Sequence, residues 1–170
     1  MNHHLIIERL SQNVSIIKSI TDEISDEQAG WKSSQKDWSI LEIINHMYDE
    51  EKDDFRTRLK LVLEDPGSSW PPIDPEGWAI ERKYNERDFS QSLINFLNER
   101  ELSISWLKSL DSPDWKSTGT HPKLGPMSAE MLLANWLAHD LLHIRQIVGM
   151  HWSYLSHMVE PISLDYAGNL

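Results

Sequence analysis

The chain has 170 residues, of which 39% are hydrophobic and 25% are charged, a composition typical of one folded domain with its own core. It contains no cysteine, which excludes disulfide bonds, thiolate metal ligands and a cysteine nucleophile. The formal net charge is −11, and a field of that sign repels phosphate backbones, so we expect no binding to nucleic acid.

Two amphipathic helices are predicted in the first part of the chain, over residues 5–20 and 39–63. Apolar residues recur along both segments at the three- and four-residue spacing of a helix face. Ser39 and Glu42 are spaced as a capping box, in which each side chain accepts a hydrogen bond from a free backbone N–H group. We therefore expect the second helix to begin at Ser39.

Two further helices are predicted over residues 88–110 and 128–149. The segment 65–75, between the second and third helices, carries four prolines and one glycine, so it must be a loop. The segment 114–126 contains proline, glycine and threonine and is predicted to be another loop. Residues 151–170 are expected to form a tail packed over the helices.

These helices favour an all-α fold, a four-helix bundle formed by residues 1–170 as a single domain. Strand signals are nearly absent, because no segment sustains an alternation of polar and apolar residues and no Asn-Gly or Asp-Gly turn occurs. The long connection between the second and third helices suits a crossover better than a tight turn.

The fourth predicted helix carries the most informative residues. His139 and His143 are four positions apart, so both imidazoles project from one helix face, about 6 Å apart along the axis. Leu132 lies one heptad before His139, and Trp136 lies one heptad before His143. The two histidines therefore continue an apolar stripe and are predicted to point inward.

His46 lies at the edge of the apolar stripe of the second helix, and a bundle could bring this face against the fourth helix. Together with His139 and His143 it would form an open three-histidine metal site, with one coordination position left to water or substrate. The alternative is three separate core histidines, each bonded to a carbonyl or carboxylate. Because each unsatisfied buried polar group costs roughly 1–3 kcal/mol, a metal shared by all three is favoured.

Two polar residues near the histidines have open roles. Glu50, one turn after His46, is a candidate fourth ligand, an acceptor behind a ligand or a weak candidate for a catalytic base, and a solvated carboxylate is an equal alternative. Gln146, three residues after His143, is expected to line the pocket or to pack as a polar residue.

Other polar residues are expected to lie outside the site. Asp140 points about 100° away from the histidine face. The remaining histidines are expected to lie on the surface: His3, His4, His121, His151 and His157.

Several segments resemble motifs of the DinB-like (DinB/YfiT) superfamily. Residues 38–46, Trp-Ser-Ile-Leu-Glu-Ile-Ile-Asn-His, resemble its second-helix motif. Residues 121–128 and 136–146 resemble its approach loop and fourth helix, although Arg145 stands where relatives often carry glycine before the glutamine. The resemblance covers essentially the whole chain in helix order and loop placement.

The resemblance implies a four-helix bundle with a three-histidine site for a divalent metal ion, zinc or nickel above all. The matching positions are His46, His139 and His143. Characterised relatives include thiol-dependent S-transferases and a thiol-dependent isomerase, and others are regarded as metal-dependent hydrolases. Members often form homodimers, which is the expectation here too, although no feature of this sequence identifies the helix face involved.

A metal-dependent enzyme that acts on a small molecule is the first functional hypothesis. An open site can bind a low-molecular-weight thiol as its thiolate, which gives an S-transferase, or lower the pKa of bound water toward about 7, which gives a hydrolase. The second hypothesis is a non-catalytic binding or structural protein, stabilised by a metal whose fourth position is closed. Because no apolar stretch approaches a bilayer-spanning length and residues 1–10 lack the pattern of a signal peptide, we expect a cytoplasmic protein that does not bind membranes.

Overall fold

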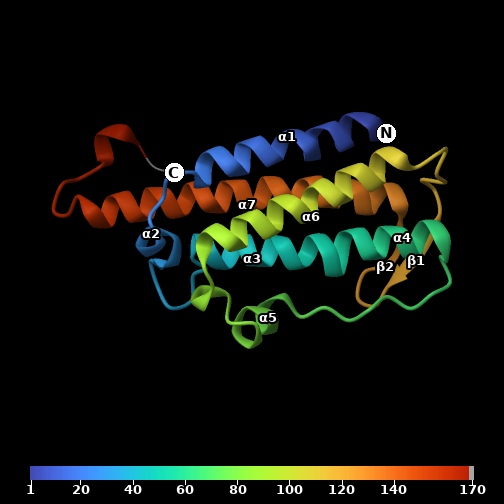
Figure 1. Ribbon diagram of the computed structural model, residues 1–170, viewed down its shortest axis with the longest axis horizontal. Helices are drawn as coiled ribbons and strands as arrows, with labels where there is room; N and C mark the ends of the chain where they lie inside the picture. The colour runs from blue at the N-terminus through green and yellow to red at the C-terminus, as the bar shows by residue number, and fades with distance from the viewer. Residues whose placement is uncertain (169–170) are drawn as a thin grey trace.

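The computed structural model describes residues 1–168 and is built mainly from helices packed side by side (Figure 1). Its long helical stretches form a bundle, which confirms the predicted all-α fold class. Three of these stretches are single helices, and a fourth, over residues 40–64, is composite. The single helices are α1 (His3–Thr21), α6 (Phe89–Ser109) and α7 (Ala129–Met158). None of the helices that the structure describes combines the length and the hydropathy that a bilayer-spanning helix requires.

The composite stretch begins with the predicted capping box. The Glu42 N–H donates to Ser39 Oγ at 3.1 Å, and the Ser39 N–H donates to Glu42 Oε2 at 2.9 Å. Both donors would otherwise be unpaired at the helix start, so the two bonds fix where the chain enters the bundle. The stretch consists of α3 (Ile40–Asp49), the π-helical segment η1 (Glu50–Phe55) and α4 (Arg56–Glu64).

The π-helical segment η1 interrupts the regular stripe that was expected over residues 39–63. At its end the Arg56 N–H donates to the Glu51 carbonyl, five residues back, so this turn is wider than an α-helical turn. The wider turn buries two consecutive carboxylates, Glu50 and Glu51, which a regular amphipathic helix would not place inside together. The π segment starts four residues after His46, directly beside the predicted site.

The connection between α4 and α6 is the expected long crossover, but part of it is helical. The helix α5 (Pro75–Glu81) follows the prolines, and a 3₁₀ turn, η2 (Tyr84–Glu86), follows α5. Asp74 caps α5 by accepting a hydrogen bond from the Gly77 N–H at 3.1 Å, and Pro75 occupies a position where no N–H is needed. So short a helix shows no periodic stripe, which is why the sequence did not indicate it.

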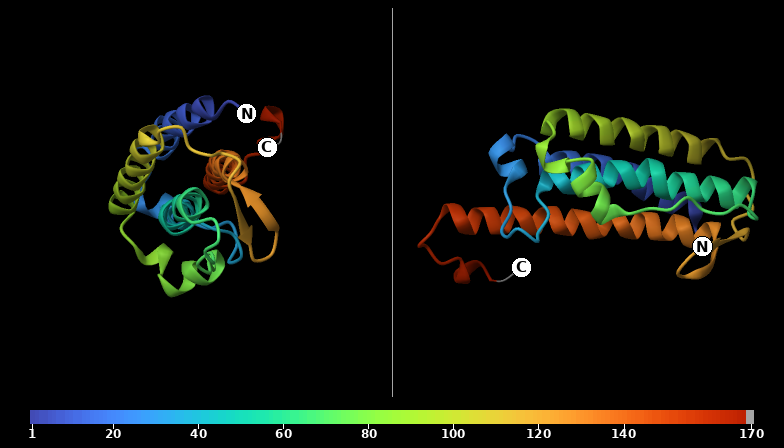
Figure 2. Two further views of the ribbon diagram at one scale, coloured as in Figure 1. Left: turned by 90° about the vertical axis from the view of Figure 1, so that its right-hand side faces the viewer. Right: turned by 90° about the horizontal axis from the view of Figure 1, so that it is seen from below.

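A small antiparallel hairpin lies beside one end of α7, within a segment that was predicted to be loop (Figure 2). Strand β1 (Thr118–His121) pairs with β2 (Gly125–Ser128). Gly125 has φ +78°, a conformation that glycine adopts without strain, and it helps to turn the chain between the strands. The loop prediction for residues 114–126 was therefore wrong here, because strands of this length are too short to show an alternation.

The last helix is longer than the sequence indicated. It runs to Met158, well past the expected end at residue 149, and its final turns extend beyond the other helices (Figures 1 and 2). Trp31, just after α2 (Asp26–Gly30), packs on this extension, with its ring 5.4 Å from that of Tyr154 and 5.5 Å from that of His157. The tail predicted over residues 151–170 is wrong in its first part, because α7 continues to Met158, and η3 (Asp165–Ala167) lies beyond the helix. Residues 169–170 of this prediction lie outside the described residues.

A polar layer divides the core of the bundle into two apolar halves. Leu10, Leu59 and Leu107 belong to one apolar cluster, and Ile17 and Phe96 belong to the other. Buried polar side chains lie between the two apolar clusters. They are Asn13, His46, Glu50, Glu51, Asp54, Arg100, Asp140 and His143. The predicted site is part of this layer.

Candidate metal site

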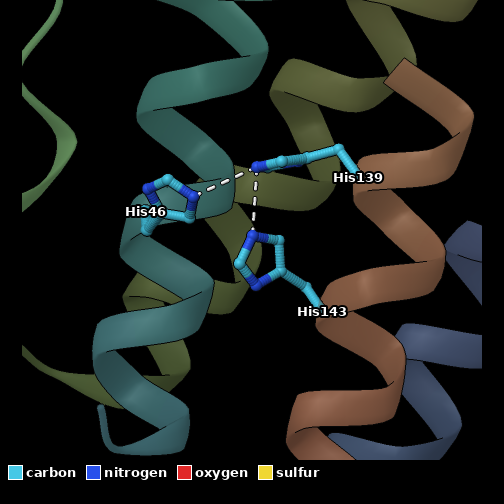
Figure 3. Close-up of side chains that lie close together, drawn as sticks. All are labelled: His46, His139 and His143. Carbon is cyan, nitrogen blue, oxygen red and sulfur yellow. Dashed lines mark hydrogen bonds between the residues drawn. The ribbon is translucent and has the colours of Figure 1, made fainter. Parts of the chain in front are cut away.

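The structure brings the three predicted histidines together. His46 projects from α3, and His139 and His143 project from successive turns of α7 toward it (Figure 3). His139 Nε2 lies 3.1 Å from His46 Nε2 and 3.0 Å from His143 Nε2. One ligand atom from each ring lies within 4.8 Å of the others, and the group contains no other histidine or carboxylate among the described residues.

The spacing of these nitrogen atoms fits a metal ion. A tetrahedral site with metal–nitrogen bonds of 2.0–2.1 Å holds its ligand atoms about 3.3 Å apart. The two Nε2 separations at His139, 3.1 and 3.0 Å, are close to that value. If His139 carries its proton on Nε2, that N–H can donate to only one of the two neighbouring Nε2 atoms, whereas a shared cation would engage the lone pairs of all three rings.

Burial keeps the three imidazoles in the form that binds metal. Removal from water lowers the pKa of His46 to about 3, and His143 contributes further. Burial lowers the pKa of His139 to about 2, with contributions from His143, His46 and Arg100. The pKa of His143 is also lowered, mainly by burial. All three rings are therefore neutral at pH 7, and their lone pairs are available without the release of a proton.

Gln146 fixes which nitrogen of His143 faces the site. The His143 Nδ1–H donates to the Gln146 side-chain oxygen at 2.8 Å, so the lone pair resides on Nε2. By contrast, His46 Nδ1 is buried and has no hydrogen-bond partner within residues 1–168, and its ring is held by the edge-on contact with Trp38, 4.8 Å between centroids. Gln146 thus has a definite role, where the sequence left a choice between pocket lining and packing.

Glu50 does not belong to the group of ligand atoms. Its side chain is 4% exposed, so the solvated alternative is wrong, and its carboxyl group shares a hydrogen bond with Asp54. Burial, followed by the charge of Asp54, raises the pKa of Glu50 to about 8. Arg58 lies against this pair, with Nε 2.7 Å from an Asp54 oxygen. At pH 7 Glu50 is therefore a neutral acid buried in the π turn.

Replacement of Glu50 by glutamine is expected to make stability less dependent on pH. The folded protein holds the Glu50 proton up to about pH 8, whereas the unfolded chain releases it near the ordinary pKa of 4.5. The wild-type contribution is complete below pH 4.5 and is lost as the pH rises to about 8, by up to about 1.4 kcal/mol per pH unit. Glu50→Gln stays neutral and lacks this loss.

Urea denaturation of the metal-free protein at pH 6.5, 7.3 and 8 measures the difference. The free energy of unfolding of the wild type should fall relative to that of Glu50→Gln across this range. Glu101→Gln, on an exposed position of α6, is the matched control and should follow the wild type. Parallel curves for wild type and Glu50→Gln would contradict a raised pKa at Glu50.

Asp140 has a role that the sequence did not reveal. It points away from the three histidines, as expected, but it is 0% exposed and accepts two hydrogen bonds of 2.6 Å from the Arg100 guanidinium. Arg100 also lies 2.8 Å from Glu51, and the Asn13 amide donates to Asp140 at 2.9 Å. This buried network ties α1, η1, α6 and α7 together on a face of α7 that is turned about 100° from His139.

The other histidines lie outside the site, but only His4 and His157 are exposed as predicted. The rest are half-buried, because each has a structural partner that the sequence does not indicate. His3 stacks on Trp115, His121 Nδ1 accepts hydrogen bonds from the hairpin turn, and His151 lies 2.5 Å from the Ile20 carbonyl.

A cavity of about 760 Å³ opens onto the three histidines. Its wall includes His46, His139 and His143, together with residues from the loop before α3, from α5 and from the second half of α7. A cation held by these histidines would therefore have at least one position that faces the cavity. This arrangement corresponds to an open site, in which substrate can reach the metal, rather than to a closed structural site.

The helical bundle and the three neutral histidines at the wall of a cavity place this chain among helical-bundle proteins with a candidate metal site. The chain belongs to the DinB superfamily, whose family model matches residues 9–147. This finding confirms the resemblance recognised in the sequence motifs.

Similar proteins carry names that agree with such a site. A protein of Oceanobacillus iheyensis named as a candidate metal-dependent hydrolase is 26% identical over 136 residues, which cover 79% of this chain and 77% of that protein. A protein of Bacillus licheniformis with the same description is 23% identical over 141 residues, or 81% and 78% of the two chains.

The fold is also that of a solved structure. YfiT from Bacillus subtilis, described as a probable metal-dependent hydrolase with an unusual four-helix bundle topology, superimposes with a TM-score of 0.79. The alignment covers 89% of this chain and 87% of YfiT, at 20% sequence identity. At this identity the comparison shows a shared fold.

Proposed function

We propose that the protein is a metal-dependent hydrolase that acts on a small molecule. His46, His139 and His143 are its protein ligands to one divalent cation, zinc or nickel. The observation that carries the proposal is the convergence of three neutral Nε2 atoms on the wall of a cavity. The names of the relatives as metal-dependent hydrolases support the same reaction class.

The residues of the site have distinct tasks in this proposal. A divalent cation supplies Lewis acidity, which polarises a substrate carbonyl and lowers the pKa of water toward about 7. The three histidines hold the cation and leave the cavity side open. Gln146 keeps the His143 lone pair on Nε2, and Trp38 restricts the ring of His46. Nitrogen ligands suit several first-row metals, so metal availability in the cell selects the ion.

Thiol-dependent S-transfer is the second candidate reaction. The cavity volume of about 760 Å³ leaves room for a low-molecular-weight thiol beside a small substrate. A soft thiolate also binds zinc well, and its nucleophilicity would replace that of water. The open cavity argues against the third alternative, a metal-stabilised protein without turnover. We place the protein in the cytoplasm, where such thiols are abundant. We also propose that it forms a homodimer.

Turnover assays can separate these alternatives. The purified protein is analysed for metal, and hydrolysis of a panel of activated aryl esters and amides is followed with and without cellular thiols. The hydrolase proposal expects turnover that a chelator abolishes and that zinc or nickel restores. Turnover that requires a thiol would select the S-transferase. A fully metal-loaded protein that is inactive across the panel would favour the non-catalytic alternative.

Gln146→Met is expected to weaken metal binding by about 10–100-fold, because it removes the acceptor that orients His143 while preserving the length of the side chain. Competition with a chelating dye at pH 7.5 measures the affinity of the variant and of the wild type for zinc. Gln12→Met, on an exposed position of α1, should leave the affinity unchanged. Equal affinities for Gln146→Met and wild type would remove Gln146 from the site.

A further inference from the structure

The wall of the cavity beside the histidines combines polar residues with a group of apolar side chains. It is formed by residues 33–38, by the start of α5 and by the part of α7 from Leu142 to Ser153. The apolar side chains that these segments contribute are Trp38, Pro75, Leu142, Met150 and Trp152. Two tryptophans in one small-molecule cavity provide broad flat surfaces for a ligand.

This apolar surface begins next to the metal ligands. The Trp38 ring contacts the His46 ring edge-on, with 4.8 Å between the centroids. Leu142 directly precedes His143 and is 47% exposed at the cavity. A molecule that reaches the open coordination position therefore meets apolar side chains immediately around its reacting group.

Gly149 is part of the cavity wall. It lies inside α7, where glycine is a poor helix former compared with alanine or leucine. Its position, three residues after Gln146, lines the cavity. A larger side chain at this position would favour the helix and would narrow the cavity.

The charged residues of the wall argue against a strongly anionic occupant. The lysine Lys36 is accompanied by two carboxylates, Asp37 and Glu76. The Asp37 carboxylate already accepts hydrogen bonds from Ser33 and Ser34, at 2.6 and 2.8 Å. Apart from the proposed cation, the side chains that line the cavity therefore carry more negative than positive charge, and the chain as a whole has a net charge of −11, so the wall itself does not attract a polyphosphate group.

We propose that the substrate carries a flat apolar group, such as an aromatic ring, directly beside the bond that reacts at the metal. This inference rests on the proposed function, because the metal defines where the reacting bond lies. Trp38, Leu142, Met150 and Trp152 provide the apolar surface that buries the ring, and Gly149 lies in the same wall.

Two inhibitors with the same metal-binding head test this proposal. Acetohydroxamate and benzohydroxamate chelate zinc through the same two oxygen atoms, but only the second carries an aromatic ring. Calorimetric titration of the zinc-loaded protein gives both affinities. Benzohydroxamate is expected to bind at least about tenfold more tightly, because the cavity buries its ring.

Three variants on α7 locate the ring. Gly149→Leu should abolish the preference for benzohydroxamate and retain binding of acetohydroxamate, because leucine fills the cavity and leaves the histidines in place. Val148→Leu, one residue earlier, exposed and outside the cavity wall, should retain the preference. Trp152→Ala should reduce the preference without changing acetohydroxamate binding, which provides a second readout if Gly149→Leu folds poorly.

The outcomes separate the inference from the function on which it rests. If acetohydroxamate binds and benzohydroxamate binds no more tightly, the aromatic substrate class is wrong while the metal site stands. A preference that persists in both Gly149→Leu and Trp152→Ala would also overturn it, because the ring would then lie elsewhere. If neither hydroxamate binds the zinc-loaded protein, the open metal site itself is wrong.

Discussion

His139→Ala is expected to abolish stoichiometric metal binding. The Nε2 atom of His139 lies 3.1 Å from that of His46 and 3.0 Å from that of His143. The substitution therefore removes the central one of the three proposed ligand atoms and leaves only two. Loss of a residue that only hydrogen-bonds to a metal ligand already weakens metal binding by about 10–100-fold. Removal of a ligand itself should therefore weaken metal binding by more than about 100-fold. A metal present at 100 times its Kd stabilises the folded state by about 2.7 kcal/mol, and nearly all of this should disappear.

Elemental analysis and thermal unfolding with and without zinc test this expectation. Wild type should carry about one metal ion per chain and gain stability with zinc, whereas His139→Ala should do neither. His4→Ala is the matched control, because His4 is exposed and lies outside the group of ligand atoms. The unfolding free energy without metal distinguishes a lost ligand from a misfolded variant. Equal metal stoichiometry in His139→Ala and wild type would exclude His139 as a ligand.

The histidine site could be predicted because its information is local. His139 and His143 share a helix face through their spacing, and the apolar residues one heptad earlier show that this face is buried. His46 could be added because it lies beside an apolar stripe whose start the capping box at Ser39 fixes. Helix periodicity and capping chemistry therefore predicted the bundle and the place where the two helices meet.

The π turn could not be predicted, because its cause is tertiary. Residues 50–54 are all charged, and such a run usually indicates an exposed face. The wider turn instead directs Glu51 toward Arg100 and Glu50 toward Asp54. Arg100 lies far from Glu51 in the sequence, so the residues around Glu51 do not show that its charge is compensated by an arginine.

Arg100→Met is expected to lower the free energy of unfolding by about 3–5 kcal/mol. Arg100 is 1% exposed and is the cation between Asp140 and Glu51, at 2.6 and 2.8 Å. Methionine approximates its volume but leaves two carboxylates buried without a compensating charge, which is the costly way to break a buried ion pair. The Trp136 Nε1–H, which donates to Glu51 at 3.0 Å, cannot compensate for that charge.

Urea denaturation at pH 7 measures this loss, and Arg9→Met, at an exposed position of α1, is the matched control with an expected change within about 0.5 kcal/mol. A triple variant, Arg100→Met with Glu51→Gln and Asp140→Asn, separates charge from packing. It keeps the shapes of the acidic side chains but removes both charges, so it should recover part of the stability that Arg100→Met loses. If the triple variant is no more stable than Arg100→Met, the network contributes through packing, and its charges are not what holds the four helices in register beside the metal site.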